Sequence, residues 1–200
     1  MQINFVVALP AEARPINARF GLKRRQPDGD FPVYRNDETA LVLCGVGKAA
    51  AAAATRFLHG RNGGPNGALW LNAGIAGHPS AAIGTPMLAR RISDAETGQA
   101  WEARFGFEPP CAMEDLVTLG RPGFGYDRPC AFDMEAAGFF SAARGITAPG
   151  LVQCFKVISD NRDNPGHGIS AKTVSRLIEA RLDTLALLLA RMGKSVINSP

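Results

Sequence analysis

The chain has 200 residues, of which 46% are hydrophobic and 20% charged, and its formal net charge is +4 at pH 7. This composition is typical of a soluble globular protein and excludes a disordered chain. No stretch approaches the ~20 consecutive apolar residues that a membrane span requires. Apart from Lys23-Arg24-Arg25, the basic residues are scattered among acidic ones, so we expect no nucleic-acid partner.

The length suits a single domain with one hydrophobic core. We expect this domain to cover residues 1–194 and the last residues, 195–200, to be frayed. The apolar N-terminus lacks the basic lead of a signal peptide, which indicates a cytoplasmic protein. The histidines and cysteines do not have the spacing of a metal site, so we expect neither a metal nor another cofactor.

Apolar runs rich in β-branched and aromatic residues predict strands, and alanine-rich or amphipathic segments predict helices. The predicted elements, in chain order, are a strand at 2–8, a helix from 10 toward 20, a hairpin of 31–35 and 40–44, a helix at 48–59, strands at 68–73 and 86–92, a strand ending at 132–135, a helix to about 144, a strand at 151–158 and one long helix at 170–192. The pattern is weak between 93 and 129. Strands separated by helices predict an α/β protein, a three-layer α/β/α sandwich with a central mixed sheet.

Acidic residues stand where the predicted strands end. Glu12 comes just after the first strand, Glu135 stands at the strand end predicted at 132–135, and Asp160 stands at the end of a later strand. Open α/β sheets assemble their ligand sites at such strand ends. A buried carboxylate also requires a hydrogen-bonding partner or a bound ligand. These acids therefore predict one pocket that binds hydroxyl groups and moves protons. The glycine stretch 74–77 indicates either a ligand contact or a tight turn.

Five short stretches, taken in order, carry a resemblance to a known family. The chain resembles the superfamily of purine nucleoside phosphorylases and 5′-methylthioadenosine/S-adenosylhomocysteine nucleosidases over nearly its whole length. The matching stretches are residues 6–12, 44–50, 72–77 with Ile83-Gly84 after it, 133–136 and 158–161. The resemblance implies a nucleoside pocket at the C-terminal edge of the sheet, a small-molecule nucleoside as substrate, and a homo-oligomer that is a dimer or a hexamer.

The resemblance also implies two catalytic residues. Asp160 matches the acid that protonates the purine at N7, and Glu12 matches the carboxylate that orients and deprotonates the attacking water. The residues themselves leave other interpretations open. Asp160 is also consistent with a loop-closing or helix-capping aspartate, and Glu12 with a glutamate on the surface of a helix.

Further positions match substrate-binding residues of the family. Glu135 matches a glutamate that accepts hydrogen bonds from the ribose hydroxyls, and Met134 a methionine that packs on the sugar. Lys156 stands where nucleosidases place an arginine that helps to hold the nucleophile. Without the resemblance, Glu135 is a charge in the first turn of a helix and Lys156 a strand-edge lysine. The rest of the expected binding set is Phe132, Ala76, Gly77, Ser159 and Phe124, the last as the aromatic that stacks on the base, with Phe105 and Phe107 as alternatives.

Three functions are open at this point. A nucleosidase that hydrolyses the N-glycosidic bond of an adenine-type nucleoside is favoured, because a carboxylate at Glu12 suits water activation and repels phosphate. A phosphate-dependent nucleoside phosphorylase, including the hopanoid-associated type, is the alternative, with Arg14 and Lys48 as the anion site. The third possibility is a nucleoside-binding protein without turnover.

Overall fold

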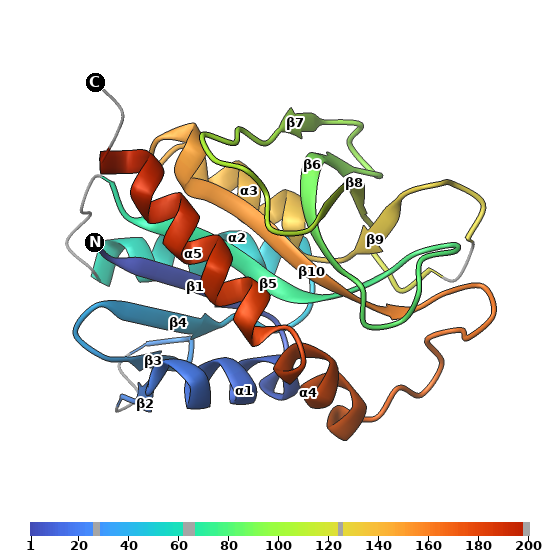
Figure 1. The fold of residues 1–200 in the computed structure, drawn as a ribbon, viewed down its shortest axis with the longest axis horizontal. Helices are drawn as coiled ribbons and strands as arrows, with labels where there is room; N and C mark the ends of the chain where they lie inside the picture. The colour runs from blue at the N-terminus through green and yellow to red at the C-terminus, as the bar shows by residue number, and fades with distance from the viewer. Residues whose placement is uncertain (26–28, 62–66, 124–125, 198–200) are drawn as a thin grey trace.

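The computed structural model describes residues 1–25, 29–61, 67–123 and 126–197. In these ranges, strands and helices follow one another along the chain (Figure 1). The elements are β1 (Ile3–Val7), α1 (Pro10–Phe20), β2 (Lys23–Arg24), β3 (Val33–Arg35), β4 (Thr39–Leu43), α2 (Lys48–Arg61), β5 (Leu69–Gly77), β6 (Pro86–Asp94), β7 (Ala100–Glu102), β8 (Ala112–Thr118), β9 (Ala131–Asp133), α3 (Ala136–Ala143), the 3-10 helix η1 (Pro149–Leu151), β10 (Val152–Asp160), α4 (Ala171–Glu179) and α5 (Leu182–Ile197).

The strands of the described residues form one mixed sheet, in the order β10-β6-β8-β9-β5-β1-β4-β3-β2, with β7 paired to β6. β4, β1, β5 and β10 are parallel neighbours, so their carboxyl ends lie along one edge of the sheet. β5 also pairs with β9, and the strands β5, β10, β6, β8 and β9 thereby close into a ring. The predicted hairpin is confirmed as the antiparallel pair of β3 and β4.

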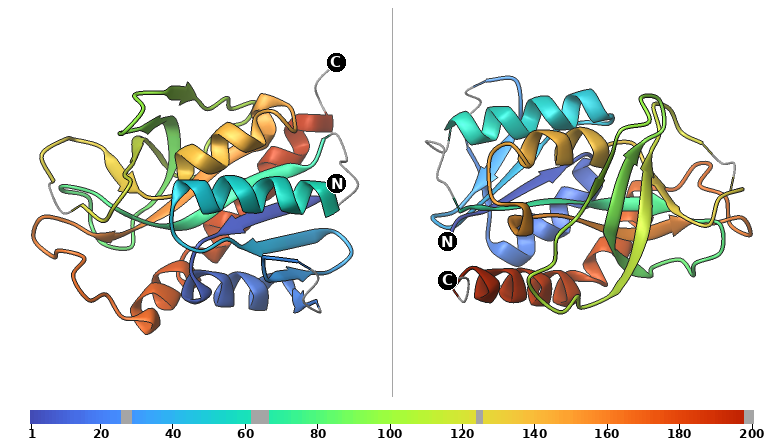
Figure 2. Two further views of the ribbon diagram at one scale, coloured as in Figure 1. Left: turned by 180° about the vertical axis from the view of Figure 1, so that it is seen from behind. Right: turned by 90° about the horizontal axis from the view of Figure 1, so that it is seen from above.

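Helices cover both faces of the sheet, as the view from above shows (Figure 2). α2 and α3 pack together on one face, and α1, α4 and α5 lie on the other. Alternate residues of β1 serve the two cores, with Val6 in the cluster that contains α2 and α3, and Phe5 and Val7 in the cluster that contains α5. The expected three-layer α/β/α arrangement is therefore confirmed.

The glycine stretch 74–77 is not a turn, because β5 continues through it to Gly77. The missing side chains make room for two carboxylates. A Cβ atom at Gly74 would lie 2.7 Å from Glu12 Oε1, and one at Gly77 would lie 2.7 Å from Asp160 Oδ2. The glycines therefore let acids from other elements approach the strand closely.

The single helix expected at 170–192 is wrong, since α4 ends at Glu179 and α5 begins at Leu182. Arg181 lies in the turn between them, and its Nε donates to the carbonyl oxygen of Gly84 at 2.6 Å. The break lets α4 pack on α1 while α5 lies against the core of the sheet. A continuous amphipathic pattern does not reveal such a break, because both helices bury the same kind of face.

The segment between 93 and 129 also contains strands that the sequence did not predict. β8 is buried only from Leu116 onward, and its first two residues are exposed, so its apolar signal is short. β7 has three residues and pairs with β6 alone. Strands this short or this exposed lack the alternation on which sequence prediction relies.

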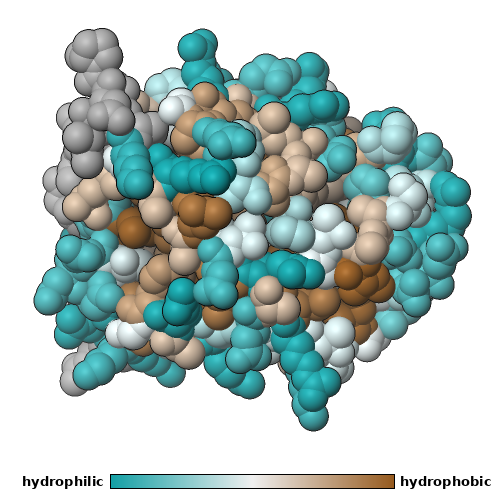
Figure 3. All heavy atoms as spheres, in the orientation of Figure 1, coloured by the Kyte–Doolittle hydropathy of each residue, from teal (hydrophilic) through white to brown (hydrophobic). Residues whose placement is uncertain are grey.

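The face that carries α4 and α5 has hydrophobic residues separated by hydrophilic ones (Figure 3). Leu187 on α5 is 45% exposed. Single exposed apolar side chains of this kind are normal on protein surfaces. Within the described ranges, no helix has the length and apolar character needed to cross a membrane.

Candidate functional site

A cavity of about 360 Å³ opens at the carboxyl ends of β1, β5, β9 and β10. Of the expected catalytic and binding residues that the structure describes, all but Lys156 line this cavity, whereas the alternatives Phe105 and Phe107 and the cations Arg14 and Lys48 do not. Phe124 lies outside the described residues. The lining residues are Ala8, Leu9, Glu12, Val46, Ile75, Ala76, Gly77, Leu119, Pro122, Gly123, Phe132, Asp133, Met134, Glu135, Ser159, Asp160, Gly166, Gly168, Ile169 and Val174. Glu12 lies more than 120 residues of chain away from Glu135 and Asp160, yet the three acids share one cavity.

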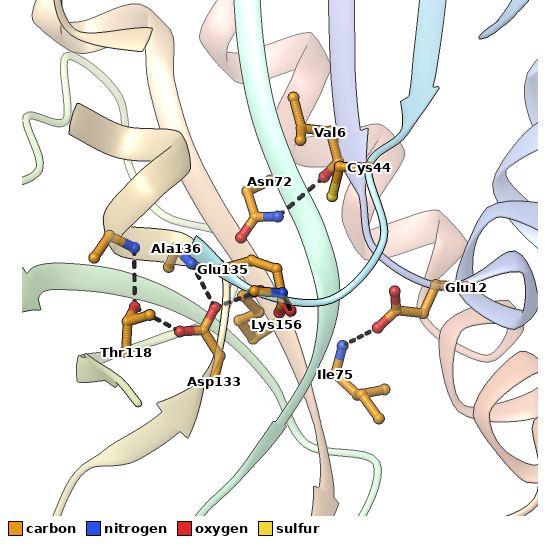
Figure 4. A network of polar contacts seen from close by, with 12 residues as sticks. Val6, Glu12, Cys44, Asn72, Ile75, Thr118, Asp133, Glu135, Ala136 and Lys156 are labelled. Carbon is orange, nitrogen blue, oxygen red and sulfur yellow. Dashed lines mark hydrogen bonds and ion pairs between the residues drawn. The ribbon is translucent and has the colours of Figure 1, made fainter. Parts of the chain in front are cut away.

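Glu12 is buried in the first turn of α1, with 2% of its surface exposed. Its carboxylate accepts backbone N–H bonds from Leu9 at 2.9 Å and from Ile75 at 2.8 Å, the second of which appears in Figure 4. Burial raises the pKa of Glu12 to about 7, although the charge of Lys156 and the two N–H groups oppose that rise. A surface glutamate is therefore excluded, and the group can exchange a proton near neutral pH.

Glu135 immediately precedes α3, but its side chain does not cap that helix. Its Oε1 atom instead accepts the backbone N–H of Gly47 at 2.8 Å, across the cavity from the loop after β4. Burial raises the pKa of Glu135, the charge of Lys156 opposes the rise, and Asp133 adds to it. A carboxylate can accept about four hydrogen bonds, so Glu135 retains capacity to accept hydrogen bonds from a ligand.

Lys156 is buried beneath the cavity, where its Nζ atom lies 2.8 Å from Asp133 Oδ2 (Figure 4). Burial lowers the pKa of Lys156, but the charges of Asp133 and Glu135 outweigh that effect and hold it above its ordinary value. Asp133 also accepts hydrogen bonds from the hydroxyl of Thr118 at 2.7 Å and from the N–H of Ala136 at 2.8 Å. Lys156 therefore supplies a fixed positive charge near the acids rather than a surface that contacts the ligand.

Asp160 is the last residue of β10, and each of its carboxylate oxygens accepts a hydroxyl hydrogen bond. Ser159 Oγ donates to Oδ1 at 2.5 Å, and Tyr126 Oη donates to Oδ2 at 2.6 Å. A Cβ atom at Gly166 would lie 2.9 Å from its Cγ atom, so a second glycine besides Gly77 leaves room for this acid. Sequence reasoning missed Tyr126, because it lies in the segment without a clear pattern.

Phe105 and Phe107 do not line the cavity, so the expectation that either could stack on the base is wrong. Their rings contact each other with centroids 5.7 Å apart. Both rings pack against the hydrophobic cluster that contains α5. Phe132 and Met134 are the large side chains that β9 and the residue after it bring to the cavity.

The anion site suggested by Arg14 and Lys48 is not formed. Arg14 is exposed on α1. Lys48 Nζ lies 2.7 Å from an oxygen of Asp94 and 2.6 Å from Glu96 Oε2. Neither cation lines the cavity, and its described lining contains no lysine, arginine or histidine.

In the described part of the chain, no group of three or more histidine, cysteine or acidic residues is arranged to hold a metal ion. His78 directly follows the lining residue Gly77. Its Nδ1 atom accepts the backbone N–H groups of Ser80 and Ala81 at 3.1 and 2.9 Å. Burial lowers the pKa of His78, which favours the neutral ring that these two bonds require.

Comparison of the chain with known proteins gives a structural likeness alone. No protein-family model matches it, and no curated protein matches by sequence. Among solved structures, a 5′-methylthioadenosine/S-adenosylhomocysteine nucleosidase from Helicobacter pylori matches with a TM-score of 0.75 and 15% identity, over 95% of this chain and 98% of that one. The 5′-methylthioadenosine nucleosidase of Arabidopsis thaliana matches with a TM-score of 0.75 and 19% identity, over 96% and 95%.

A futalosine hydrolase from Helicobacter pylori also matches, with a TM-score of 0.70 and 15% identity over 97% of both chains. Structural matches at such low sequence identity establish the fold alone, so the chemistry has to be argued from the residues of the site. These matches cover almost the full length of each chain. The protein therefore shares its overall fold with these two nucleosidases and with the futalosine hydrolase.

Proposed function

We propose that the protein is a nucleosidase that hydrolyses the N-glycosidic bond of an adenine-type nucleoside to free base and sugar. The observation that carries this proposal is the shared cavity of Glu12, Glu135 and Asp160 at the strand ends. Cleavage of this bond passes through an oxocarbenium-like sugar. It therefore needs a general acid that protonates the leaving purine and a general base that takes a proton from the attacking water. It also needs a group that binds the sugar.

Each acid has a role in this mechanism. Asp160 donates a proton to the purine as the bond between the anomeric carbon and the base breaks, and the bonding electrons leave with the base. Glu12 takes a proton from the water whose oxygen bonds to the anomeric carbon. Glu135 accepts hydrogen bonds from the ribose hydroxyls. Asp160 ends as a carboxylate and Glu12 as a carboxylic acid, and solvent restores both for the next turnover.

The charge of the cavity favours water over phosphate as the nucleophile. Four carboxylates line the cavity, those of Glu12, Asp133, Glu135 and Asp160, and no cation is among the described lining residues. A phosphate dianion would be repelled there, because charges interact strongly where water is largely excluded. Lys48 is held by two acids elsewhere, so the phosphorylase alternative lacks its cation.

The apolar part of the lining supports a nucleoside with an uncharged 5′ substituent. Leu9, Val46, Ile169 and Val174 supply aliphatic surface to the cavity. Structures of the Helicobacter pylori nucleosidase contain 5′-methylthioadenosine in one case and a butyl-thio inhibitor in another. On the family resemblance we further propose a cytoplasmic homo-oligomer, either a dimer or a hexamer, which the native mass would distinguish.

Incubation of the purified protein with adenosine and with 5′-methylthioadenosine, each with and without phosphate, tests the proposal. Hydrolysis releases free adenine at the same rate in both conditions. Release only with phosphate would instead identify a phosphorylase, and tight binding without release would identify a binding protein. Either result contradicts the proposed reaction.

Asp160→Asn tests the assigned acid. We expect turnover to fall by roughly 10²- to 10⁴-fold, because a carboxamide cannot supply the proton. Asp163→Asn is the matched control, since Asp163 is exposed in the loop that follows and its loss should leave turnover unchanged. Normal turnover in Asp160→Asn would mean that another group protonates the base.

A further inference from the structure

Tyr126 lies against the proposed acid but does not belong to the wall of the cavity. It is 7% exposed, and its hydroxyl donates to Asp160 Oδ2 at 2.6 Å. It is absent from the lining residues, so a bound nucleoside would reach Asp160 without displacing it. Tyr126 therefore contacts Asp160 through Oδ2 without itself lining the cavity.

The loop that follows Asp160 holds Tyr126 in place. A guanidinium nitrogen of Arg162 donates to the backbone carbonyl of Tyr126 at 2.5 Å. The backbone N–H of Gly166 lies near the Tyr126 hydroxyl. Burial and the contact with Asp160 raise the pKa of Tyr126 to about 12, an effect that the Gly166 N–H opposes. The phenol thus keeps its proton at neutral pH and acts as a hydrogen-bond donor to Asp160.

We propose that Tyr126 is a positioning residue for Asp160, which fixes the orientation of its carboxyl group and stabilises the carboxylate left after the proton has moved to the departing base. This inference rests on the proposed nucleosidase reaction. A hydrogen bond to an ionised acceptor is stronger than one to the neutral acid. The bond from Tyr126 therefore strengthens as Asp160 loses its proton, so it favours the transition state over the bound substrate.

The proton balance of this step is simple. The proton on Asp160 goes to a ring nitrogen of the purine, and the electrons of the broken glycosidic bond go to the base. Tyr126 neither gains nor loses a proton. Ser159 donates to the other carboxylate oxygen, and its hydroxyl can rotate when Asp160 is protonated.

The test compares two leaving groups in the variant Tyr126→Phe. Adenosine needs a proton on its base, whereas the phenolate of 4-nitrophenyl β-D-ribofuranoside leaves without one. We expect kcat for adenosine to fall roughly 10- to 100-fold, the loss typical of a hydrogen bond to a charged group, while KM changes little. For the nitrophenyl riboside we expect kcat to change less than about 3-fold, because no acid is used.

Tyr34→Phe is the matched control, because Tyr34 lies on β3 and does not line the cavity. It should leave the cleavage of both substrates unchanged. Equal losses for the two substrates in Tyr126→Phe would overturn the proposal, since they would show a general structural defect. No loss for adenosine would overturn it as well. A wild-type protein that cleaves neither substrate would refute the proposed function itself, whatever Tyr126 does.

A spectroscopic titration measures the contact without relying on turnover. The chain has two tyrosines, so Tyr126 is the only tyrosine in a Tyr34→Phe background. Its tyrosinate absorbance should develop near pH 12, and addition of Asp160→Asn should move that transition to lower pH, because the neighbouring carboxylate is gone. A transition that Asp160→Asn leaves in place would show that Tyr126 does not contact the acid, and would overturn the proposal.

Discussion

The burial of Glu12 predicts a specific pH dependence of stability. An ordinary glutamate has a pKa of 4.5, whereas the pKa of Glu12 in the folded protein is about 7. The folded state therefore holds this proton more tightly than the unfolded state. The resulting stabilisation is fully present below about pH 4.5 and is lost as the pH rises through about 7, where the folded chain carries a buried charge.

The size of the effect follows from the same two pKa values. Each pKa unit corresponds to about 1.4 kcal/mol, so the rise of the Glu12 pKa from 4.5 to about 7 corresponds to roughly 3 kcal/mol of unfolding free energy. Glu12→Gln removes the titration but places an amide NH₂ beside one of the two backbone N–H donors. Loss of that bond lowers the unfolding free energy of the variant by the same amount at every pH. Only the pH-dependent part of the stability difference therefore measures burial of the charge.

Urea unfolding of the wild type and of Glu12→Gln at pH 5, 6, 7 and 8 checks this prediction. Between pH 5 and 8, the stability of the variant relative to the wild type should improve by about 2 to 3 kcal/mol. Glu38→Gln is the control, because the side chain of Glu38 is exposed to solvent. A stability difference between wild type and Glu12→Gln that stays constant across this pH range would refute the reasoning, because it would mean that folding does not perturb Glu12.

Two further predictions concern packing. Gly138→Ala should destabilise the protein by about 1 to 3 kcal/mol, since its Cβ atom would lie 1.8 Å from the backbone oxygen of Lys48. The control Gly60→Ala in α2 meets no atom within 4 Å and should be neutral or stabilising in the same denaturation assay. Lys156→Met should cost about 3 to 5 kcal/mol of unfolding free energy, because it leaves the charge of Asp133 buried without its partner. A melting temperature unchanged from the wild type would show that this ion pair is not needed.

Local pattern was sufficient to predict most of the elements. The strand at the start of the chain, the alanine-rich helix α2 and the buried strand β10 all have strong periodicity or composition, and all are confirmed. The errors lie where the local signal is weak or ambiguous. At the break between α4 and α5, Arg181 donates a hydrogen bond to Gly84, nearly a hundred residues away, and no local pattern contains such a contact.

The candidate site follows the same division. The sequence identified Glu12, Glu135 and Asp160 through their places after strands and through a family resemblance that no sequence comparison detects. Parallel pairing of β1, β5 and β10 brings Glu12 and Asp160 to one edge of the sheet, because the carboxyl ends of parallel neighbours coincide. Glu135 reaches the same edge because β9 pairs antiparallel with the end of β5, at Gly77.

Partners and protonation were decided by the tertiary structure alone. Side chains from distant segments decide the contacts of three site residues. They pair Lys156 with Asp133, hold Lys48 away from an anion, and place the Tyr126 hydroxyl on Asp160. The raised pKa of Glu12 likewise arises from burial by the assembled layers. A sequence specifies which groups can ionise and donate, whereas desolvation and charge pairing exist only after those groups are packed together.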